Sequence, residues 1–154
     1  MKLILTTLAF AALSAAPALA AGDAAAGEAI FKQCQTCHVV ANEAGEVLAG
    51  KNAKTGPNLY GVVGRVAGTY PDFKYGDSII ALGAMPYVWT EDDIAVYVQD
   101  PAAFLKEKTG DSKAKSKMSF KVKKPEDAAN VAAYIASLAP APAAEGEAAP
   151  AATN

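Results

Sequence analysis

The stretch Cys34-Gln35-Thr36-Cys37-His38 decides the fold of this 154-residue chain. Two cysteines at this spacing, followed at once by histidine, form the attachment signature of a c-type haem. Two thioether bonds can then reach the vinyl groups on one porphyrin edge, while the next residue directs its imidazole at the iron. These are the chain's 2 cysteines and its 1 histidine. We therefore predict one haem c, bound covalently by Cys34 and Cys37, with His38 as an axial iron ligand.

Two other uses of a paired cysteine motif fit the sequence less well. A redox-active dithiol usually follows a strand of a βαβ unit, whereas the segment from Ala24 to Gln33 is rich in alanine and favours a helix. A structural zinc site needs four ligands, and two cysteines and one histidine supply three. Both readings are therefore disfavoured.

The N-terminus has the layout of a secretory signal. Lys2 provides the positive start, Leu3 to Leu13 an apolar core, and Ala18-Leu19-Ala20 a cleavage site of small residues. The apolar stretch is shorter than the about 20 residues that cross a bilayer, although an uncleaved anchor is the alternative. We predict a signal peptide over residues 1–20 and, because c-type attachment follows export, a protein of the bacterial periplasm that does not span the membrane.

The remainder of the chain divides into one domain and a tail. Removing the signal leaves 13 basic and 16 acidic residues, and this acidic balance disfavours a nucleic-acid partner. Residues 140–154 are almost entirely Ala, Pro, Glu and Gly, too few apolar groups to offset the entropy of ordering. We predict a single haem-binding domain over residues 21–139 and a disordered tail over residues 140–154.

Three helices are indicated by their ends. The first has Asp23 as a plausible N-cap. The second begins with a capping box formed by Thr90 and Asp93 and ends at Asp100-Pro101. The third has Pro125 at its first position, and its apolar stripe consists of Val131, Tyr134, Ile135 and Leu138.

The stretches between these helices are rich in Gly, Asn, Lys and Pro. Residues 38–58 and 61–76 show few alternating apolar patterns, and so many turns rarely leave a sufficient core. Loops wrapped around a covalent haem would supply the missing apolar volume. We therefore predict an all-α, single-domain fold with long haem-enclosing loops and almost no sheet.

The sixth iron ligand is sought among the methionines, because no second histidine exists. Met85 follows the apolar run Ile79 to Leu82, and packing in the core is its more ordinary role. Met118 lies in a lysine-rich segment that offers it no obvious apolar partners. A methionine there is better explained by iron ligation, so Met118 is favoured over Met85.

Motifs along the whole domain resemble the cytochrome c2 group of class I c-type cytochromes. They comprise residues 27–31, the haem pentapeptide, residues 54–65, 73–75 and 89–91, Tyr97, Asp100-Pro101, and Lys117-Met118-Ser119-Phe120. They occur in the family's order and are far more specific than the haem motif alone. The resemblance implies a class I cytochrome c fold and selects Met118 as the sixth ligand.

The same resemblance implies roles for residues around the haem. The Pro57 carbonyl would accept a hydrogen bond from His38, and Gly27 would allow the first and last helices to approach closely. Tyr97 would form a hydrogen bond near the Met118 sulfur. The haem propionates would be held by Tyr75, Trp89 and Arg65.

Lysines gather around Met118 in a chain that is acidic elsewhere. Eight of the fourteen basic residues are Lys106, Lys108, Lys113, Lys115, Lys117, Lys121, Lys123 and Lys124. Such a run is most often a solvated face, but beside the iron ligand it would steer encounters with acidic partners. In the resembling group these partners are the cytochrome bc1 complex and a photosynthetic reaction centre or an oxidase.

Three functions compete. A monomeric one-electron carrier needs a closed His38 and Met118 site, whereas a haem enzyme or gas binder needs an open position and a distal His or Arg. No second histidine exists, and the one arginine, Arg65, is assigned to the propionates. A membrane-tethered carrier would retain the apolar N-terminus. We favour the soluble carrier, which is not an enzyme.

Overall fold

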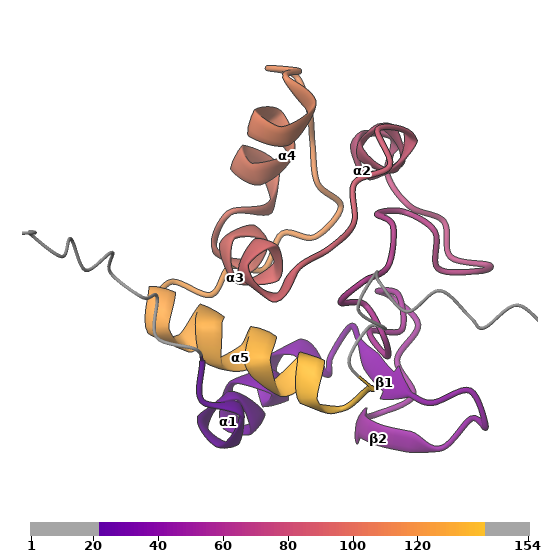
Figure 1. Ribbon diagram of the computed structural model, residues 1–154, viewed down its shortest axis with the longest axis vertical. Coiled ribbons are helices and arrows are strands. Elements are labelled where there is room, and N and C mark those ends of the chain that lie inside the picture. The colour runs from indigo at the N-terminus through magenta and orange to yellow at the C-terminus, as the bar shows by residue number, and fades with distance from the viewer. Residues whose placement is uncertain (1–21, 141–154) are drawn as a thin grey trace, which may run out of the picture.

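The computed structural model describes residues 22–140 (Figure 1). The predicted signal peptide and the tail from Ala141 onward lie outside this range. Five helices and two short strands follow in the order α1 (Ala24–Cys34), β1 (Val39–Ala41), β2 (Val47–Gly50), α2 (Asp77–Ala84), α3 (Glu91–Gln99), α4 (Pro101–Thr109) and α5 (Pro125–Ser137). Figure 1 shows α1 and α5 crossing at the base, with α3 above α5.

The two ends of the domain meet where α1 crosses α5. Asp23 caps α1 by accepting hydrogen bonds from the amides of Ala25 and Ala26, as predicted. Gly27 is buried, and a Cβ atom there would overlap the backbone of Asn130 on α5. Beside it the rings of Phe31 and Tyr134 pack with centroids 5.5 Å apart. The prediction that Gly27 allows this close crossing is confirmed.

The predicted boundaries of α3 and α5 are also confirmed. Thr90 and Asp93 form a complete capping box, and α3 ends one residue before Asp100. Pro125 opens α5, whose residues Val131 and Ile135 are buried. The other two positions of the predicted stripe on α5 are partly buried. α3 packs against both α5 and α4.

The sequence analysis missed two helices, α2 and α4. The N-cap of α2 is Gly76, which offers no side-chain hydrogen bond, and Leu82 is the residue of this helix buried in the core. Asp100 ends α3 and also caps α4 through a bond from the Ala103 amide. An Asp-Pro pair that stops one helix can start another, because proline suits the first helical position.

A small hairpin occupies the stretch after His38 that was expected to be irregular. β1 and β2 pair antiparallel, with Val39 opposite Gly50. Gly45 turns the chain at a φ of 81°, a left-handed conformation that favours glycine. The sheet structure of the described residues consists of these two strands. The expectation of a helical fold with almost no sheet is therefore confirmed.

Apolar residues from all the helices form one cluster. Val40, Leu82, Leu105, Ala128, Val131 and Ala132 are fully buried within it. No helix among residues 22–140 is both long enough and apolar enough to cross a membrane.

Candidate functional site

The pentapeptide forms a tight turn at the end of α1. Cys34 is the last residue of that helix, and its carbonyl oxygen accepts hydrogen bonds from the amides of Cys37, at 3.0 Å, and His38, at 2.9 Å. The turn therefore holds the two sulfurs and the imidazole on one short, internally bonded segment. All three residues are partly buried.

The imidazole of His38 is fixed by the segment that follows the hairpin. Its Nδ1 atom lies 2.9 Å from the carbonyl oxygen of Pro57, as predicted. A carbonyl only accepts, so Nδ1 carries the proton and the lone pair on Nε2 is left for a metal. Burial lowers the pKa of His38, while the Pro57 hydrogen bond opposes this effect. The ring is therefore held neutral, in the form that binds metals.

Gly56 lies directly against this ring. A Cβ atom at position 56 would overlap the His38 imidazole, including a separation of 2.5 Å from Nδ1. Only a residue without a side chain fits this position. The sequence analysis did not single out Gly56, although it precedes Pro57 in the matching stretch.

The thiol environment opposes a redox-active dithiol. Burial, followed by the neighbouring Cys37, raises the pKa of Cys34 to about 11, whereas reactive dithiols need lowered pKa values. Cys34 also lies at the C-terminal end of α1, where the helix dipole disfavours a negative thiolate. Within residues 22–140 no group of three metal-binding side chains of the His, Cys, Asp and Glu types comes together.

Met118 lies in a lysine-rich segment, residues 111–124, which we call the methionine strap. Its side chain is partly buried and packs against the core. Its amide donates to the Ser116 hydroxyl at 3.0 Å, and that hydroxyl lies 3.1 Å from the Tyr97 hydroxyl. Tyr97 was expected to bond near the methionine sulfur. Its bond instead goes to Ser116, which in turn holds the Met118 backbone.

Met85, the alternative ligand, was expected to fill a gap in the core. This expectation is wrong, because Met85 is 54% exposed. It caps the C-terminal end of α2, where the chain turns outward before Pro86.

The residues assigned to the propionates lie close to one another. The Arg65 guanidinium donates to the carbonyl oxygens of Asn58 and Tyr60. Burial lowers the pKa of Arg65, and the neighbouring Tyr75 opposes this effect. Trp89 is buried, with 7% of its surface exposed, and its amide donates to the Arg65 carbonyl oxygen at 3.0 Å. These contacts organise Arg65, Tyr75 and Trp89 as a group, while their propionate role stays a prediction.

The attachment turn fits a covalent haem. It offers a neutral imidazole with its proton on Nδ1 and two cysteines, while ligation by the Met118 thioether stays a prediction. Partly buried apolar side chains also pack against the core and keep part of their surface exposed; they include Leu59, Ile79 and Tyr97. An apolar prosthetic group would bury these surfaces.

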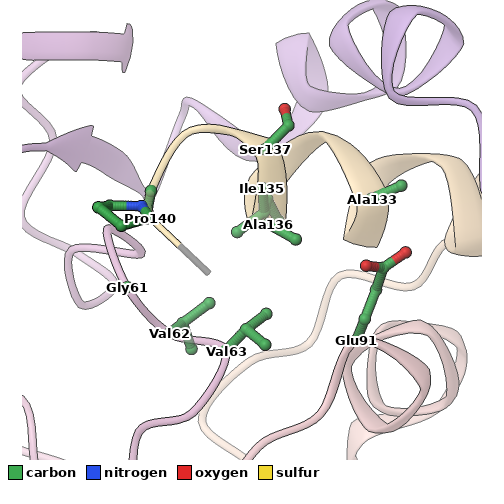
Figure 2. A pocket seen from close by; sticks show the side chains of 10 residues that line it. Gly61, Val62, Val63, Glu91, Ala133, Ile135, Ala136, Ser137 and Pro140 are labelled. Carbon is green, nitrogen blue, oxygen red and sulfur yellow. The ribbon is translucent and has the colours of Figure 1, made fainter. Parts of the chain in front are cut away.

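A separate hollow of about 420 Å³ lies between the Gly61–Val63 segment and α5 (Figure 2). Small apolar side chains such as Val62 and Ala136 line it, and Glu91 stands at its edge. None of the two cysteines, His38 and Met118 borders this hollow. It is therefore distinct from the predicted iron site.

Comparison with known proteins identifies the family. Residues 24–139 match the family model described as cytochrome c. The chain is 58% identical over 139 residues to cytochrome c2 of Rhodobacter capsulatus, covering 90% of this chain and 98% of that protein. Cytochrome c2 of Cereibacter sphaeroides is 57% identical over 136 residues, covering 87% and 94%.

Solved structures agree with the sequence match. The crystal structure of cytochrome c2 from Rhodobacter sphaeroides superposes with a TM-score of 0.73 at 57% identity, covering 75% of this chain and 95% of that one. The structure from Rhodobacter capsulatus gives a TM-score of 0.71 at 61% identity, covering 76% and 98%. The fold is that of class I cytochromes c, and the chain belongs to the cytochrome c family, whose members carry electrons on one covalently bound haem c.

Proposed function

We propose that this protein is a one-electron carrier whose haem iron is held by His38 and Met118. The observation that supports it most directly is the 2.9 Å contact between His38 Nδ1 and the Pro57 carbonyl oxygen. It leaves Nε2 as the free donor of the chain's one histidine. Cys34 and Cys37 would supply the thioether bonds.

The haem, when bound, supplies an iron that cycles between the ferric and ferrous states. The protein's residues keep its coordination closed. Met118 is held on the strap by Ser116. Its thioether, used together with the His38 imidazole, would give the iron a higher reduction potential than two imidazoles would. Arg65, the one arginine of the chain, is engaged by the Asn58 and Tyr60 carbonyls. Arg65 is therefore not available for the acid–base role that a haem enzyme would require.

The proposal extends to location and partners. Cleavage after residue 20 would release the domain into the periplasm, with residues 140–154 as a disordered tail. The protein would be a monomer. Through the exposed lysines of the strap it would dock transiently to a cytochrome bc1 complex and to a photosynthetic reaction centre or oxidase. Mass spectrometry of the mature N-terminus tests the export step: an intact Met1 would support a tethered protein instead.

The decisive experiment on ligation is the absorption spectrum of the periplasmically expressed protein, ferric and ferrous, with and without carbon monoxide. A closed site gives the weak long-wavelength sulfur-to-iron band in the ferric form and a ferrous spectrum that carbon monoxide does not change. Ready binding of carbon monoxide would contradict the proposal and favour a gas binder or haem enzyme.

Two methionine variants make this test specific. Met118→Ala should abolish the sulfur-to-iron band and allow carbon monoxide to bind. Met85→Ala is the matched control, because Met85 is exposed, and it should leave both spectra unchanged. Loss of the band in Met85→Ala but not in Met118→Ala would show that Met85 is the ligand and would contradict the proposal.

A further inference from the structure

The methionine strap is attached to the rest of the protein immediately before Met118. Three consecutive residues make three different attachments. The Lys115 amide donates to the Ser78 hydroxyl at 3.0 Å, the Ser116 hydroxyl meets Tyr97, and Lys117 Nζ donates to the Lys74 carbonyl oxygen at 2.9 Å. Two of these three attachments therefore lead to residues 74–78, at the start of α2.

Close packing accompanies the hydrogen bonds. The aliphatic part of the Lys117 side chain lies across Gly76, where an added Cβ atom would be 3.3 Å from Lys117 Cγ. Ser78 itself is partly buried, in the first turn of α2. Figure 1 shows the orange strap descending beside α2.

α2, which carries Ser78, is packed closely against the core. A Cβ atom at Gly83 would overlap the Ala67 carbonyl, so the helix lies directly on the backbone at that point. Ala67 is 1% exposed, and its amide donates to the Tyr87 carbonyl oxygen at 2.8 Å. Ser78 is therefore carried by an element that is fixed to the core independently of the strap.

The Ser78 hydroxyl has a defined task in this arrangement. It accepts from a backbone amide three residues before Met118, so it restrains the strap's main chain rather than a mobile side chain. This bond is exposed, so its loss costs no more than the net free energy of one ordinary hydrogen bond. That loss would appear when the strap moves away from the core.

We propose that Ser78 is a positioning residue for the sixth iron ligand: its bond to the Lys115 amide sets how readily Met118 leaves the iron. The proposal rests on the proposed His38 and Met118 ligation. In this role Ser78 acts through the strap's backbone. The helix that the sequence analysis missed thereby gains a function, that of holding the ligand-bearing segment.

The experiment measures how fast added imidazole replaces the Met118 thioether in the ferric protein, at saturating imidazole, where departure of the thioether limits the rate. Ser78→Ala should accelerate this replacement about fivefold, as expected for the loss of one hydrogen bond. Ser78→Thr keeps a hydroxyl and should restore a rate within about twofold of the unsubstituted protein. Ser112→Ala, at an exposed serine of the same strap, is the matched control and should have no effect.

A second measurement follows hydrogen exchange of the Lys115 amide in the same proteins. Ser78→Ala should accelerate this exchange selectively, with little change in the urea midpoint for global unfolding. Equal imidazole rates in Ser78→Ala and the unsubstituted protein would overturn the positioning role. So would faster replacement in Ser78→Ala that Ser78→Thr does not restore.

Failure of the underlying ligation has a different signature. If the unsubstituted ferric protein lacked the sulfur-to-iron band, the proposed function would fail and the positioning role would fail with it. A protein that shows the band but is insensitive at Ser78 would overturn only the present inference.

Discussion

Asp100 and Lys121 form an ion pair in which a carboxylate oxygen lies 2.8 Å from Nζ. The same aspartate caps α4 by accepting from the Ala103 amide at 3.1 Å. It thus joins the start of a helix to the far side of the methionine strap. One backbone bond, from Val122 to the carbonyl oxygen of Val98 at 2.9 Å, reinforces this attachment.

The first prediction concerns the pH dependence of this pair. The hydrogen bond from Lys121, followed by the Ala103 amide, lowers the pKa of Asp100 below its ordinary value of 3.8. A carboxyl with a depressed folded pKa contributes stability above its unfolded pKa and loses it as pH falls through the folded pKa. Asp100→Asn should therefore flatten the fall in unfolding free energy below about pH 4, measured by urea titration at several pH values.

Asp100→Ala separates the two roles of this residue. Asparagine retains N-capping ability, whereas alanine does not. Asp100→Ala should therefore lose additional stability that does not depend on pH. If the unfolding free energy of Asp100→Asn had the same pH dependence as that of the unsubstituted protein, the ion pair would not contribute to acid sensitivity.

The second prediction concerns the crossing of α1 and α5. Gly27→Ala places a methyl group where the Asn130 backbone already lies, and overpacking of this kind costs about 1–3 kcal/mol or more. Chemical denaturation of the ferric protein measures the loss. Glu28→Ala, at an exposed neighbour on the same helix, should change the unfolding free energy by less than about 0.5 kcal/mol; equal effects would contradict the close-approach argument.

The third prediction concerns Gly56 and the axial imidazole. In Gly56→Ala the new methyl group would push the His38 ring away from the Pro57 carbonyl. The Nδ1 proton would then exchange faster with water, which NMR of the reduced protein can follow, and the reduction potential would shift because ligand basicity changes. Lys54→Ala, an exposed position two residues earlier, is the control. A Gly56→Ala protein with an unchanged ring proton and potential would refute the packing role.

The fourth prediction concerns docking. Lys113 and Lys115 are exposed on the strap, and replacing both by alanine should slow association with an acidic redox partner about tenfold at low salt. The difference should vanish as added salt screens the interaction. Stopped-flow oxidation of the ferrous protein by the purified partner measures the rate.

A charge-matched control accompanies this pair. Ala26→Glu with Ala29→Glu changes net charge by the same amount on exposed positions of α1. A local docking surface predicts little slowing in this control. Equal slowing in both proteins would assign the effect to net charge and remove the docking role from the strap.

The sequence predicted those parts of the fold whose signals are local. Asp23, Thr90 with Asp93, and Pro125 mark helix starts through their own side chains, and the structure confirms all three. α2 escaped prediction because Gly76 carries no capping group. Its position depends on the contact between Gly83 and Ala67, which are 16 residues apart in the chain. A contact over that distance produces no periodic pattern in the sequence.

The candidate site divides in the same way. His38 and its Pro57 partner follow from a motif and a family resemblance. The bond from Lys115 to Ser78 spans 37 residues and uses a backbone amide, which every residue except proline possesses. Tyr97 was assigned to the methionine sulfur for a related reason. Its partner is Ser116, two residues before Met118, and that choice depends on the path of the strap and not on side-chain type.

The crossing of α1 and α5 also makes the start of the domain depend on its end. Phe31, three residues before the first haem cysteine, is covered by Tyr134, and that partner is synthesised about a hundred residues later. The buried face of α1 at Gly27 and Phe31 is completed only when the last helix of the domain is present. A chain cut before α5 would therefore leave the helix that carries the attachment turn without its main packing partner.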